Sequence, residues 1–463
     1  MDRPDVTKSG VTLMHGDAGR LELPDDSVDL IVTSPPYFGL RSYQDGGKHY
    51  EGQVGDEATP AEFIDALIRC TEEWVRVVKP SGSIWVNLGD KYNAYNGGRG
   101  EGTIQRNEVR QSAPRGGGLD VKDVRPKSLI GIPWRYAIRC IDDLGLILRA
   151  EVIWSKPNGL PESVTDRVRR SHEQWFHFTL NPRYYSAVDE IREQAEQARP
   201  QAARAEQLAR RHGIGEEHRQ ALLARGLGDQ GRSAATQSGT GKNSAQVLAL
   251  AAEADAALGS YTREFTMTSQ ALGKLPGSVW TVPTEPLRVP DHLGIDHFAA
   301  FPTEFPRRII QGWSPRGVCV ECGEGRRPVV DSVRCVDGVP RQDLGVRKVG
   351  GYQTAPSGIG NWRVTTERNL TGEACACPEP TAPTSPGVVL DPFGGTGTTA
   401  LVASALGRHG ISNDLSRDYL RIAAWRTSDP KQIAKAKREP FTPSQEPIDG
   451  QLDILSMLEG EAS

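Results

Sequence analysis

A glycine-rich turn late in the chain has the composition of a ligand-binding loop. The apolar residues Val388–Leu390 end in Asp391, and the turn Pro392–Thr398, with three glycines, precedes a helix predicted from Ala400 to Leu406. Glycines admit a ligand close to the backbone because they lack a Cβ, and a helix start offers unpaired N–H groups. No lysine follows the glycines, which excludes a phosphate loop, and their spacing differs from the dinucleotide fingerprint. Taken alone, the segment also fits a simple strand-to-helix turn.

A second segment places hydrogen-bond acceptors and an aromatic ring directly after an apolar run. Residues Asp29–Thr33 are followed by Ser34, Pro35, Pro36 and Tyr37. Two prolines cannot continue a strand ladder, so the chain must leave the sheet at its carboxyl edge, where open α/β sheets bind ligands. The Ser34 hydroxyl and the stiffly held Pro35 carbonyl could accept hydrogen bonds from an NH2 group. Tyr37 offers a flat face on which a base could stack. Alone, the tetrapeptide also fits a proline-rich turn.

Five of the seven cysteines lie within one stretch of the chain. Cys319 and Cys322 form one close pair, and Cys375 and Cys377 form another. Four thiolates are the ligands of a tetrahedral structural zinc site. The second pair is separated by one residue only and the gap between the pairs is long, so reduced thiols and disulfides stay as alternatives, and Cys335 could replace one ligand.

The elements that must position these residues alternate as in an α/β fold. Val28–Val32 reads as a buried strand, Phe63–Val78 as a helix and Ser83–Leu88 as a second strand, which predicts a parallel sheet. Composition then divides the chain into segments. These are 1–190, the half with the Ser-Pro-Pro-Tyr motif; 191–277, a helical insert; 278–318, a further core segment; 319–377, a cysteine-rich insert; 378–428, the half with the glycine-rich turn; and 429–463, a polar tail.

Length, charge and apolar content bound the class of protein. At 463 residues the chain is too long for one ordinary domain, and its net charge of -4 argues against a uniformly basic surface that coats nucleic acid. A local basic groove remains compatible with that charge. No run of about 18 apolar residues occurs and the first residues are polar, so we expect a cytoplasmic protein that neither spans a membrane nor is secreted. Its cysteines are those of a reducing compartment.

Together, the two motifs resemble the amino-methyltransferase family of DNA methylases. Further segments resemble that family in order: His15–Ala18 with Leu23–Asp29 before the first motif, Val152–Asn158 with Asp166–Arg167 and Ser171–Glu173 beside its target-base pocket, His297–Pro302 with Phe305–Pro306 over the cofactor methionine, and Asn413–Ser416 with Tyr419 at its ribose-binding strand end. The order of the two motifs is that of the permuted, β-type group. The resemblance covers 1–190 and 278–425. It implies a Rossmann-like methyltransferase core with a mostly parallel sheet, a helical insert and a small zinc-ribbon-like insert.

The resemblance also implies a role for each matched residue. S-adenosylmethionine would be bound by Asp17, Phe298, Asp391, Pro392, Phe393, Gly394, Gly395, Thr396, Gly397, Thr398 and Asp414. Among these, Asp391 and the turn would hold the methionine end, Asp414 the ribose hydroxyls and Asp17 the adenine amino group. Catalysis would fall to Ser34, Pro35, Pro36 and Tyr37. The family more often has one glycine and then a Ser-Gly pair in the turn, where this chain has Gly395-Thr396.

The implied reaction is methyl transfer to an exocyclic amino group of a base in double-stranded DNA. The amino lone pair is delocalised into the ring, so acceptors at its N–H groups would withdraw the charge that develops. The base must be flipped out of the duplex. Phosphate contacts would come from Lys156, Arg167, Arg169 and Arg170, unless these form a solvated charged face.

The identity of the target base rests on the first residue of the catalytic motif. A serine at position 34 favours N4 of cytosine, while N6 of adenine, for which aspartate is the commoner residue, is the alternative. A non-catalytic DNA-binding protein would show a damaged motif, and both motifs are intact. Methyl transfer to RNA or to a protein glutamine is a further alternative, although glutamine methylases usually have Asn in place of Ser34. The two inserts would contact DNA and help to choose the site.

Overall fold

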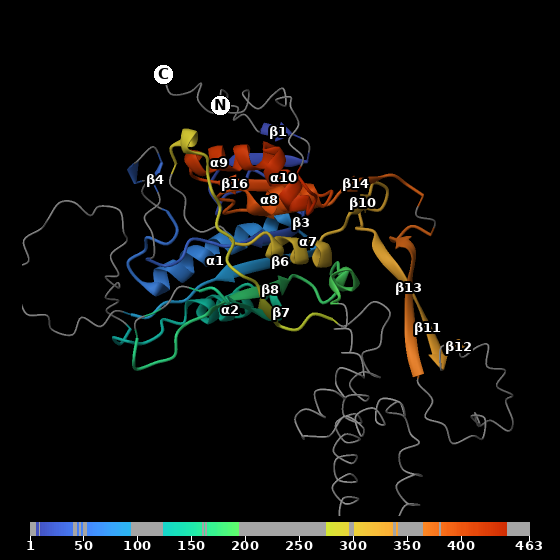
Figure 1. Cartoon of the computed structure of the whole chain (residues 1–463), viewed down its shortest axis with the longest axis horizontal. Helices are drawn as coiled ribbons and strands as arrows, with labels where there is room; N and C mark the ends of the chain where they lie inside the picture. The colour runs from blue at the N-terminus through green and yellow to red at the C-terminus, as the bar shows by residue number, and fades with distance from the viewer. Residues whose placement is uncertain are drawn as a thin grey trace, which may run out of the picture. The chain divides into compact units, whose positions relative to one another are not determined.

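The strands that carry both motifs lie in one nine-stranded sheet (Figure 1). The structure is a computed structural model that describes residues 6–8, 10–39, 44–45, 48–49, 53–93, 124–159, 162, 164–193, 275–295, 301–336, 339–340, 364–378 and 381–441. The strand order is β1 (Val6–Lys8), β2 (Val11–His15), β16 (His409–Asp414), β15 (Val388–Asp391), β3 (Val28–Thr33), β6 (Val78–Leu88), β8 (His172–Thr179), β7 (Ile147–Ser155) and β9 (Val279–Thr281). The five strands from β2 to β6 are mutually parallel. The predicted α/β fold with a mostly parallel sheet is therefore confirmed.

Strand β3 lies in the middle of this sheet and is covered on both faces. All six of its residues are buried. A strand that is covered on both sides reads as a continuous apolar run, which is the pattern that predicted it. On one side β3 pairs with β15, through Val389 opposite Leu30 and Leu390 opposite Ile31. On the other side it pairs with β6. The carboxyl ends of β15 and β3 are thereby neighbours, although more than 350 residues separate them in sequence.

Helices cover both faces of the sheet. The helices in the described residues are α1 (Pro60–Val77), α2 (Ile132–Asp142), α7 (Glu304–Trp313), α8 (Thr398–Ala405), α9 (Arg417–Ser428) and α10 (Pro430–Lys437), with short 3-10 turns at Val188–Ile191 and Asp291–Leu293. Successive residues of a strand point to opposite faces. Met14 packs in the core cluster that contains α1 and α2, whereas Leu13 packs with Ala400 of α8 and Leu420 of α9. Helices α1 and α2 thus cover one face, and α8 and α9 the other.

The first of these helices begins where its sequence supplies a complete cap. Thr59 accepts a hydrogen bond from the backbone N–H of Glu62, and the Glu62 side chain accepts one from the backbone N–H of Thr59. Pro60 fits the first helical position, where its missing N–H has no partner to lose. The buried face includes Phe63 and Trp74, both fully buried. The predicted helix therefore exists, and its cap places its start three residues earlier than the apolar spacing indicated.

The start of the predicted polar tail 429–463 is helical. Residues Pro430–Lys437 form α10, which packs on α8 and α9. Asp429 caps this helix by accepting a hydrogen bond from the N–H of Gln432, and Arg307 of α7 donates to the carbonyl of Ala436. An Asp-Pro pair is a helix-start signal, but the helix has only a narrow apolar face, so its periodicity did not reveal it. Residues 442–463 lie outside the described part of the chain.

The chain divides into two compact units. One comprises Met1–Glu190, Gly277–Arg327 and Glu373–Ser463, and the other comprises Ile191–Pro276 and Pro328–Gly372. One boundary between the two units falls after Glu190. Both ends of residues 319–377, with two cysteines each, belong to the first unit. The predicted helical character of 191–277 concerns residues that mostly lie outside the described ones.

Smaller sheets complete the described structure. Strands β10 (Gly317–Cys319) and β14 (Thr384–Pro386) pair with each other, as do β4 (Gln44–Asp45) and β5 (Lys48–His49). A three-stranded sheet has the order β12 (Val339–Pro340), β11 (Arg327–Val336) and β13 (Val364–Ala374). Among the described residues, no helix combines the length and the apolar character that crossing a bilayer requires.

Candidate active site

The two sequence motifs meet at the carboxyl edge of the sheet. Ser34–Tyr37 follows β3 and the glycine-rich turn follows β15, which is the direct neighbour of β3. The Thr33 hydroxyl, at the end of β3, donates a hydrogen bond of 2.7 Å to Asp391 Oδ1, at the end of β15. The chain order changes direction between these strands, and such switch points are where open α/β sheets bind ligands. The arrangement brings together the two segments that the sequence singled out.

Asp391 joins the two motifs from inside the protein. Its side chain is 1% exposed, and its two oxygens accept hydrogen bonds from the hydroxyls of Thr33 and Thr399 and from the backbone N–H of Phe393. Burial raises the pKa of this carboxyl to about 7, against the hydrogen bonds, which lower it. The sequence assigned Asp391 to the cofactor. In the structure its hydrogen-bond partners are protein groups, and these bonds fix the turn.

The raised pKa of Asp391 predicts a specific pH dependence of stability. Between the ordinary pKa of 3.8 and about 7, the folded protein holds a proton on this group that the unfolded chain releases. The stabilisation is therefore complete below pH 4 and is lost as the pH rises through 7, by up to about 4 kcal/mol. Asp391→Asn removes the titration. Urea titrations at pH 4 to 8 measure the unfolding free energy of both proteins. Between pH 4 and pH 8 we expect the wild type to lose stability relative to Asp391→Asn by a large part of these roughly 4 kcal/mol. Parallel curves would contradict the assignment.

The glycine-rich turn is shaped by close approaches that exclude larger residues. The Gly394 N–H donates to the Asn413 carbonyl, and a Cβ on Gly394 would lie 1.9 Å from the Ser412 Oγ. Gly395 and Gly397 have φ of +50° and +72°, a conformation that glycine adopts at low cost. Gly397 is also the N-cap of α8 and makes no side-chain capping bond. The turn is less tightly packed at Gly395, where a Cβ would meet only the Phe393 carbonyl, at 3.9 Å.

Two of the predicted cofactor acids follow the neighbouring strands. Asp414 ends β16, and its two carboxylate oxygens accept hydrogen bonds from the backbone N–H groups of Gly395 and Ser416, at 2.7 and 2.8 Å. Asp17, after β2, is exposed and accepts a hydrogen bond from the Gly19 N–H. Asp414 is thus anchored directly to the turn. Phe298, the remaining predicted cofactor residue outside this edge, lies outside the described residues.

The Ser-Pro-Pro-Tyr segment is held by Asn87, which the sequence did not single out, and by Glu173, which belongs to the segment Ser171–Glu173 of the family resemblance. Asn87 of β6 accepts hydrogen bonds through its one amide oxygen from Ser34 Oγ, at 3.2 Å, and from the Tyr37 hydroxyl, at 2.9 Å. Glu173 of β8 lies 2.8 Å from the same Tyr37 hydroxyl. The Asn87 amide nitrogen donates to the Gln174 carbonyl, which fixes which way the amide faces. A polar residue near the end of an apolar strand was the available signal for Asn87.

The tyrosine ring requires a glycine beside it. A Cβ on Gly89 would lie 2.4 Å from a ring carbon of Tyr37. The ring therefore packs against the backbone just after β6, while its hydroxyl reaches Asn87 and Glu173. These contacts, with Asn87 of β6, Glu173 of β8 and the backbone at Gly89, fix the orientation of the ring. This is the kind of rigid aromatic surface that base stacking needs.

The predicted DNA-binding residues all have partners within the protein. Lys156 forms an ion pair with Glu173 and lies 4.0 Å above the Trp154 ring. Arg167 pairs with Glu162 and stacks on the Tyr92 ring. In two further contacts, Arg169 donates to the Gly159 carbonyl and Arg170 lies 3.5 Å from Asp90. The structure thus joins Lys156 to Tyr37 of the Ser-Pro-Pro-Tyr segment through Glu173, and Arg169 is the exposed member of the arginine group.

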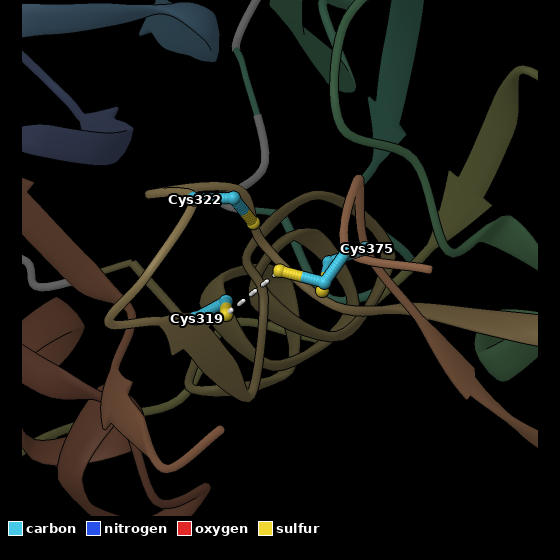
Figure 2. A group of neighbouring side chains, drawn as sticks. Cys319, Cys322 and Cys375 are labelled. Carbon is cyan, nitrogen blue, oxygen red and sulfur yellow. Dashed lines mark hydrogen bonds between the residues drawn. The ribbon is translucent and has the colours of Figure 1, made fainter. Parts of the chain in front are cut away.

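The four cysteines of the two pairs converge, although more than 50 residues separate the pairs (Figure 2). The sulfur atoms of Cys319, Cys322, Cys375 and Cys377 all lie within 4.8 Å of one another. The Cys319 and Cys377 sulfurs are 3.8 Å apart, whereas a disulfide bond is about 2.05 Å long, so these described cysteines are free thiols. Backbone N–H groups of Cys322 and Glu321 lower the pKa of the Cys319 thiol to about 6. The pattern is that of a four-thiolate site.

Comparison with known proteins bears on both halves of the site. The sequence model of the DNA methylase family matches residues 28–320 and 382–424. The chain is 41% identical over 189 residues to the Type II methyltransferase M.Cfr9I of Citrobacter freundii, and 40% identical over 193 residues to M.XycI of Xanthomonas campestris pv. cyanopsidis. Each alignment covers 40% of this chain and 60% of the relative. Among solved structures, the PvuII DNA methyltransferase (cytosine-N4-specific) is similar at 16% identity and a TM-score of 0.47, over 98% of this chain and 95% of that one.

The family match extends over well more than half of the chain and includes both motifs at the sheet edge. It is interrupted between residues 320 and 382, so Cys322, Cys375 and Cys377 lie outside the matched segments. The chain matches 60% of the length of each of these two relatives. From the family match and the motifs that it includes, we conclude that the chain belongs to the DNA methylase family of N4 and N6 amino-methyltransferases.

Proposed function

We propose that the protein transfers the methyl group of S-adenosylmethionine to an exocyclic amino group in double-stranded DNA, at N4 of cytosine. One observation carries the proposal. The Ser-Pro-Pro-Tyr segment and the glycine-rich turn, distant in sequence, stand side by side at the carboxyl edge of the sheet and are tied together by the Thr33–Asp391 hydrogen bond. Transfer between two bound groups needs this juxtaposition, because the reacting atoms must approach to about 3 to 3.5 Å.

The residues of the edge fit the proposed cofactor. The open side of the turn at Gly395 leaves space for a ligand against the backbone, where any side chain would intrude. Helix α8 begins there with neither a side-chain cap nor an acid in its first turn, which suits an anionic group. The carboxylates of Asp414 and Asp17, on adjacent strand ends, suit ribose hydroxyls and an adenine amino group. When bound, the cofactor supplies an activated sulfonium methyl group.

The hydrogen bond from Ser34 to Asn87 prepares Ser34 for the accepting role. A hydroxyl has one proton and two lone pairs, and the Ser34 proton is directed to the Asn87 amide oxygen. The lone pairs are thereby left to accept a hydrogen bond from an amino group. Such an acceptor withdraws positive charge as the nitrogen is methylated. Tyr37, fixed by Asn87, Glu173 and the Gly89 backbone, would hold the extruded base by stacking.

Cytosine is proposed over adenine because the acceptor is a serine, the residue that the family resemblance associates with N4. The test is to express the protein in cells that lack both modified bases and to analyse digested DNA by mass spectrometry. We expect N4-methylcytosine in the wild type and neither modified base in a Ser34→Ala/Tyr37→Ala double variant. N6-methyladenine instead would overturn the choice of base but retain the class of reaction. Neither base in DNA exposed to folded wild-type protein would overturn both.

We also propose that the four converging cysteines hold a structural zinc ion. Zinc bound by four thiolates at about 2.3 Å in a tetrahedron places its sulfurs about 3.8 Å apart. The Cys319–Cys377 distance equals that value. The turn after Cys319 is closed by the hydrogen bond from the Gly323 N–H to the Cys319 carbonyl, with Gly323 at a φ of +71°. Such a turn presents Cys319 and Cys322 from one side, while Cys375 and Cys377 come from the segment after β13.

Replacing Cys319 and Cys322 together by serine should remove this metal. We expect about one zinc per chain in purified wild-type protein and about none in the variant, with a lower melting temperature, because metal binding contributes to folding. Elemental analysis by mass spectrometry measures the first, and differential scanning fluorimetry the second. Cys140→Ala, which alters a buried cysteine outside the cluster, is the matched control and should retain zinc. Folded wild-type protein without zinc would reject the site.

A further inference from the structure

A buried arginine lies behind the glycine-rich turn and has no counter-ion among the described residues. Arg426, in the last turn of α9, is 4% exposed. Its Nη1 donates to the hydroxyls of Thr396 and Thr398, at 2.9 and 2.6 Å, and its buried Nε has no hydrogen-bond partner. Buried charges in proteins are normally paired. The acid whose charge acts on Arg426 is Glu285, which is itself engaged by Lys435 and Thr303.

The hydrogen bonds from Arg426 leave the hydroxyl groups of Thr396 and Thr398 free to act as donors. A guanidinium group can only donate, so both threonine oxygens must use lone pairs to accept from Arg426. Each hydroxyl proton of Thr396 and Thr398 then remains to be donated to another group. Thr398 is also the first residue of α8, whose N-terminus lacks a side-chain cap and a first-turn acid. A positive charge, two hydroxyl donors and a helix N-terminus therefore coincide at one end of the turn, and all three favour an anion.

We infer that Arg426 is a positioning residue for the carboxylate of the cofactor's methionine moiety, acting through Thr396 and Thr398. The inference rests on the proposed function, because S-adenosylmethionine supplies the anion. Its carboxylate is the one negatively charged group that the cofactor carries. Arg426 compensates that charge from behind the turn and directs the two threonine hydroxyls toward it. The adenosine part of the cofactor, at the Asp414 and Asp17 end of the edge, does not depend on Arg426.

The structure offers a matched control for this residue. Arg408, just beyond the C-terminal end of α8, is 2% exposed, and its Nε likewise has no hydrogen-bond partner. Its guanidinium donates to two backbone carbonyls, those of Leu406 and Ser314, and contacts neither threonine of the turn. Replacing either arginine by methionine removes one buried charge beside α8. Both variants lose a buried guanidinium group. A difference in their ligand affinities is therefore due to the contact of Arg426 with the turn, which Arg408 does not make.

The experiment compares two ligands that differ in the methionine moiety. S-adenosylhomocysteine carries the carboxylate, and 5′-methylthioadenosine lacks the whole amino-acid group. In calorimetric titrations we expect Arg426→Met to weaken S-adenosylhomocysteine binding at least about tenfold, which is the range of one charge-assisted contact, and to leave 5′-methylthioadenosine within about twofold. Arg408→Met should leave the ratio of the two affinities unchanged. Arg426→Lys should restore part of the lost affinity, because the charge is retained.

Several outcomes would overturn the inference. Equal weakening of both ligands by Arg426→Met would show a structural role only, and unchanged S-adenosylhomocysteine binding would show no role. If Arg426→Met does not fold, Thr398→Val removes one hydroxyl donor at nearly constant volume, and it must show the same selective loss. Failure of the proposed function is visible separately, because wild-type protein would then bind neither ligand.

Discussion

Replacing Ser34 by alanine should slow methyl transfer by about a hundredfold and leave cofactor affinity within about threefold of the wild-type value. The variant removes the oxygen whose lone pairs the Asn87 hydrogen bond leaves available, and that oxygen matters most as charge develops on the amino nitrogen. In the proposed site the cofactor lies at the neighbouring strand end, beside Gly395 and Asp414, and no hydrogen bond among the described residues joins Ser34 to either of them. A residue that acts in the transition state lowers the rate more than it changes ground-state binding.

Single-turnover methylation of a short duplex, beside a calorimetric cofactor titration, measures both quantities. Ser27→Ala is the matched control, since Ser27 precedes β3 and its hydroxyl donates to the Pro24 carbonyl, away from the carboxyl edge. It should transfer methyl groups at the wild-type rate. If the Ser34→Ala variant transfers methyl groups at the wild-type rate, Ser34 does not take part in the reaction. Loss of both cofactor binding and activity would instead mean that the Ser-Pro-Pro-Tyr segment has a structural role at the carboxyl edge of the sheet.

Substituting alanine at Gly394 should weaken S-adenosylmethionine binding by about tenfold to a hundredfold. The added Cβ would lie 1.9 Å from Ser412 Oγ, and the turn must move to relieve the clash. Overpacking of this kind costs about 1 to 3 kcal/mol, and each 1.4 kcal/mol is about tenfold in affinity. The turn is linked to β16 through the Gly394 N–H and to Asp414 through the Gly395 N–H, so a shift at Gly394 displaces both the backbone and the acid of the site.

A compensating change identifies the clash as the cause. Ser412 is buried and its hydroxyl has no hydrogen-bond partner among the described residues, so Ser412→Gly removes the opposing atoms at the modest cost of a glycine in a strand. Ser412→Gly alone should bind the cofactor nearly as the wild type does, and the Gly394→Ala/Ser412→Gly double variant should recover most of the loss. Isothermal titration of all four proteins gives the coupling. If Gly394→Ala binds S-adenosylmethionine with wild-type affinity, the turn is not part of the cofactor site.

The sequence by itself determined the elements whose signals are local. The buried strand before Ser34 is a mostly apolar run, the prolines after it end the strand, and a helix follows the glycines after Asp391. Each of these features depends on residues a few positions apart, which is the range over which backbone sterics and side-chain periodicity act. The α/β class and the two motif segments could therefore be predicted, and so could the pairing of Cys319 with Cys322.

Only the tertiary structure decided which distant side chains meet. The Thr33–Asp391 hydrogen bond joins residues 358 positions apart, and it exists because β3 and β15 are neighbours in register. The same register places Asp391, a predicted cofactor residue, where it joins the two motifs from a buried position. Asn87 and Glu173 reach Ser34 and Tyr37 because β6 and β8 lie next in the sheet.

The position of Arg426 behind the turn depends likewise on how α9 packs against α8, because no local pattern in the sequence marks that arginine among many others. Strand order and helix packing are set by the burial of whole faces against segments far along the chain. A short-range pattern carries no information about which segment that will be, so the contacts that orient the candidate catalytic and cofactor groups appear only once the faces are packed.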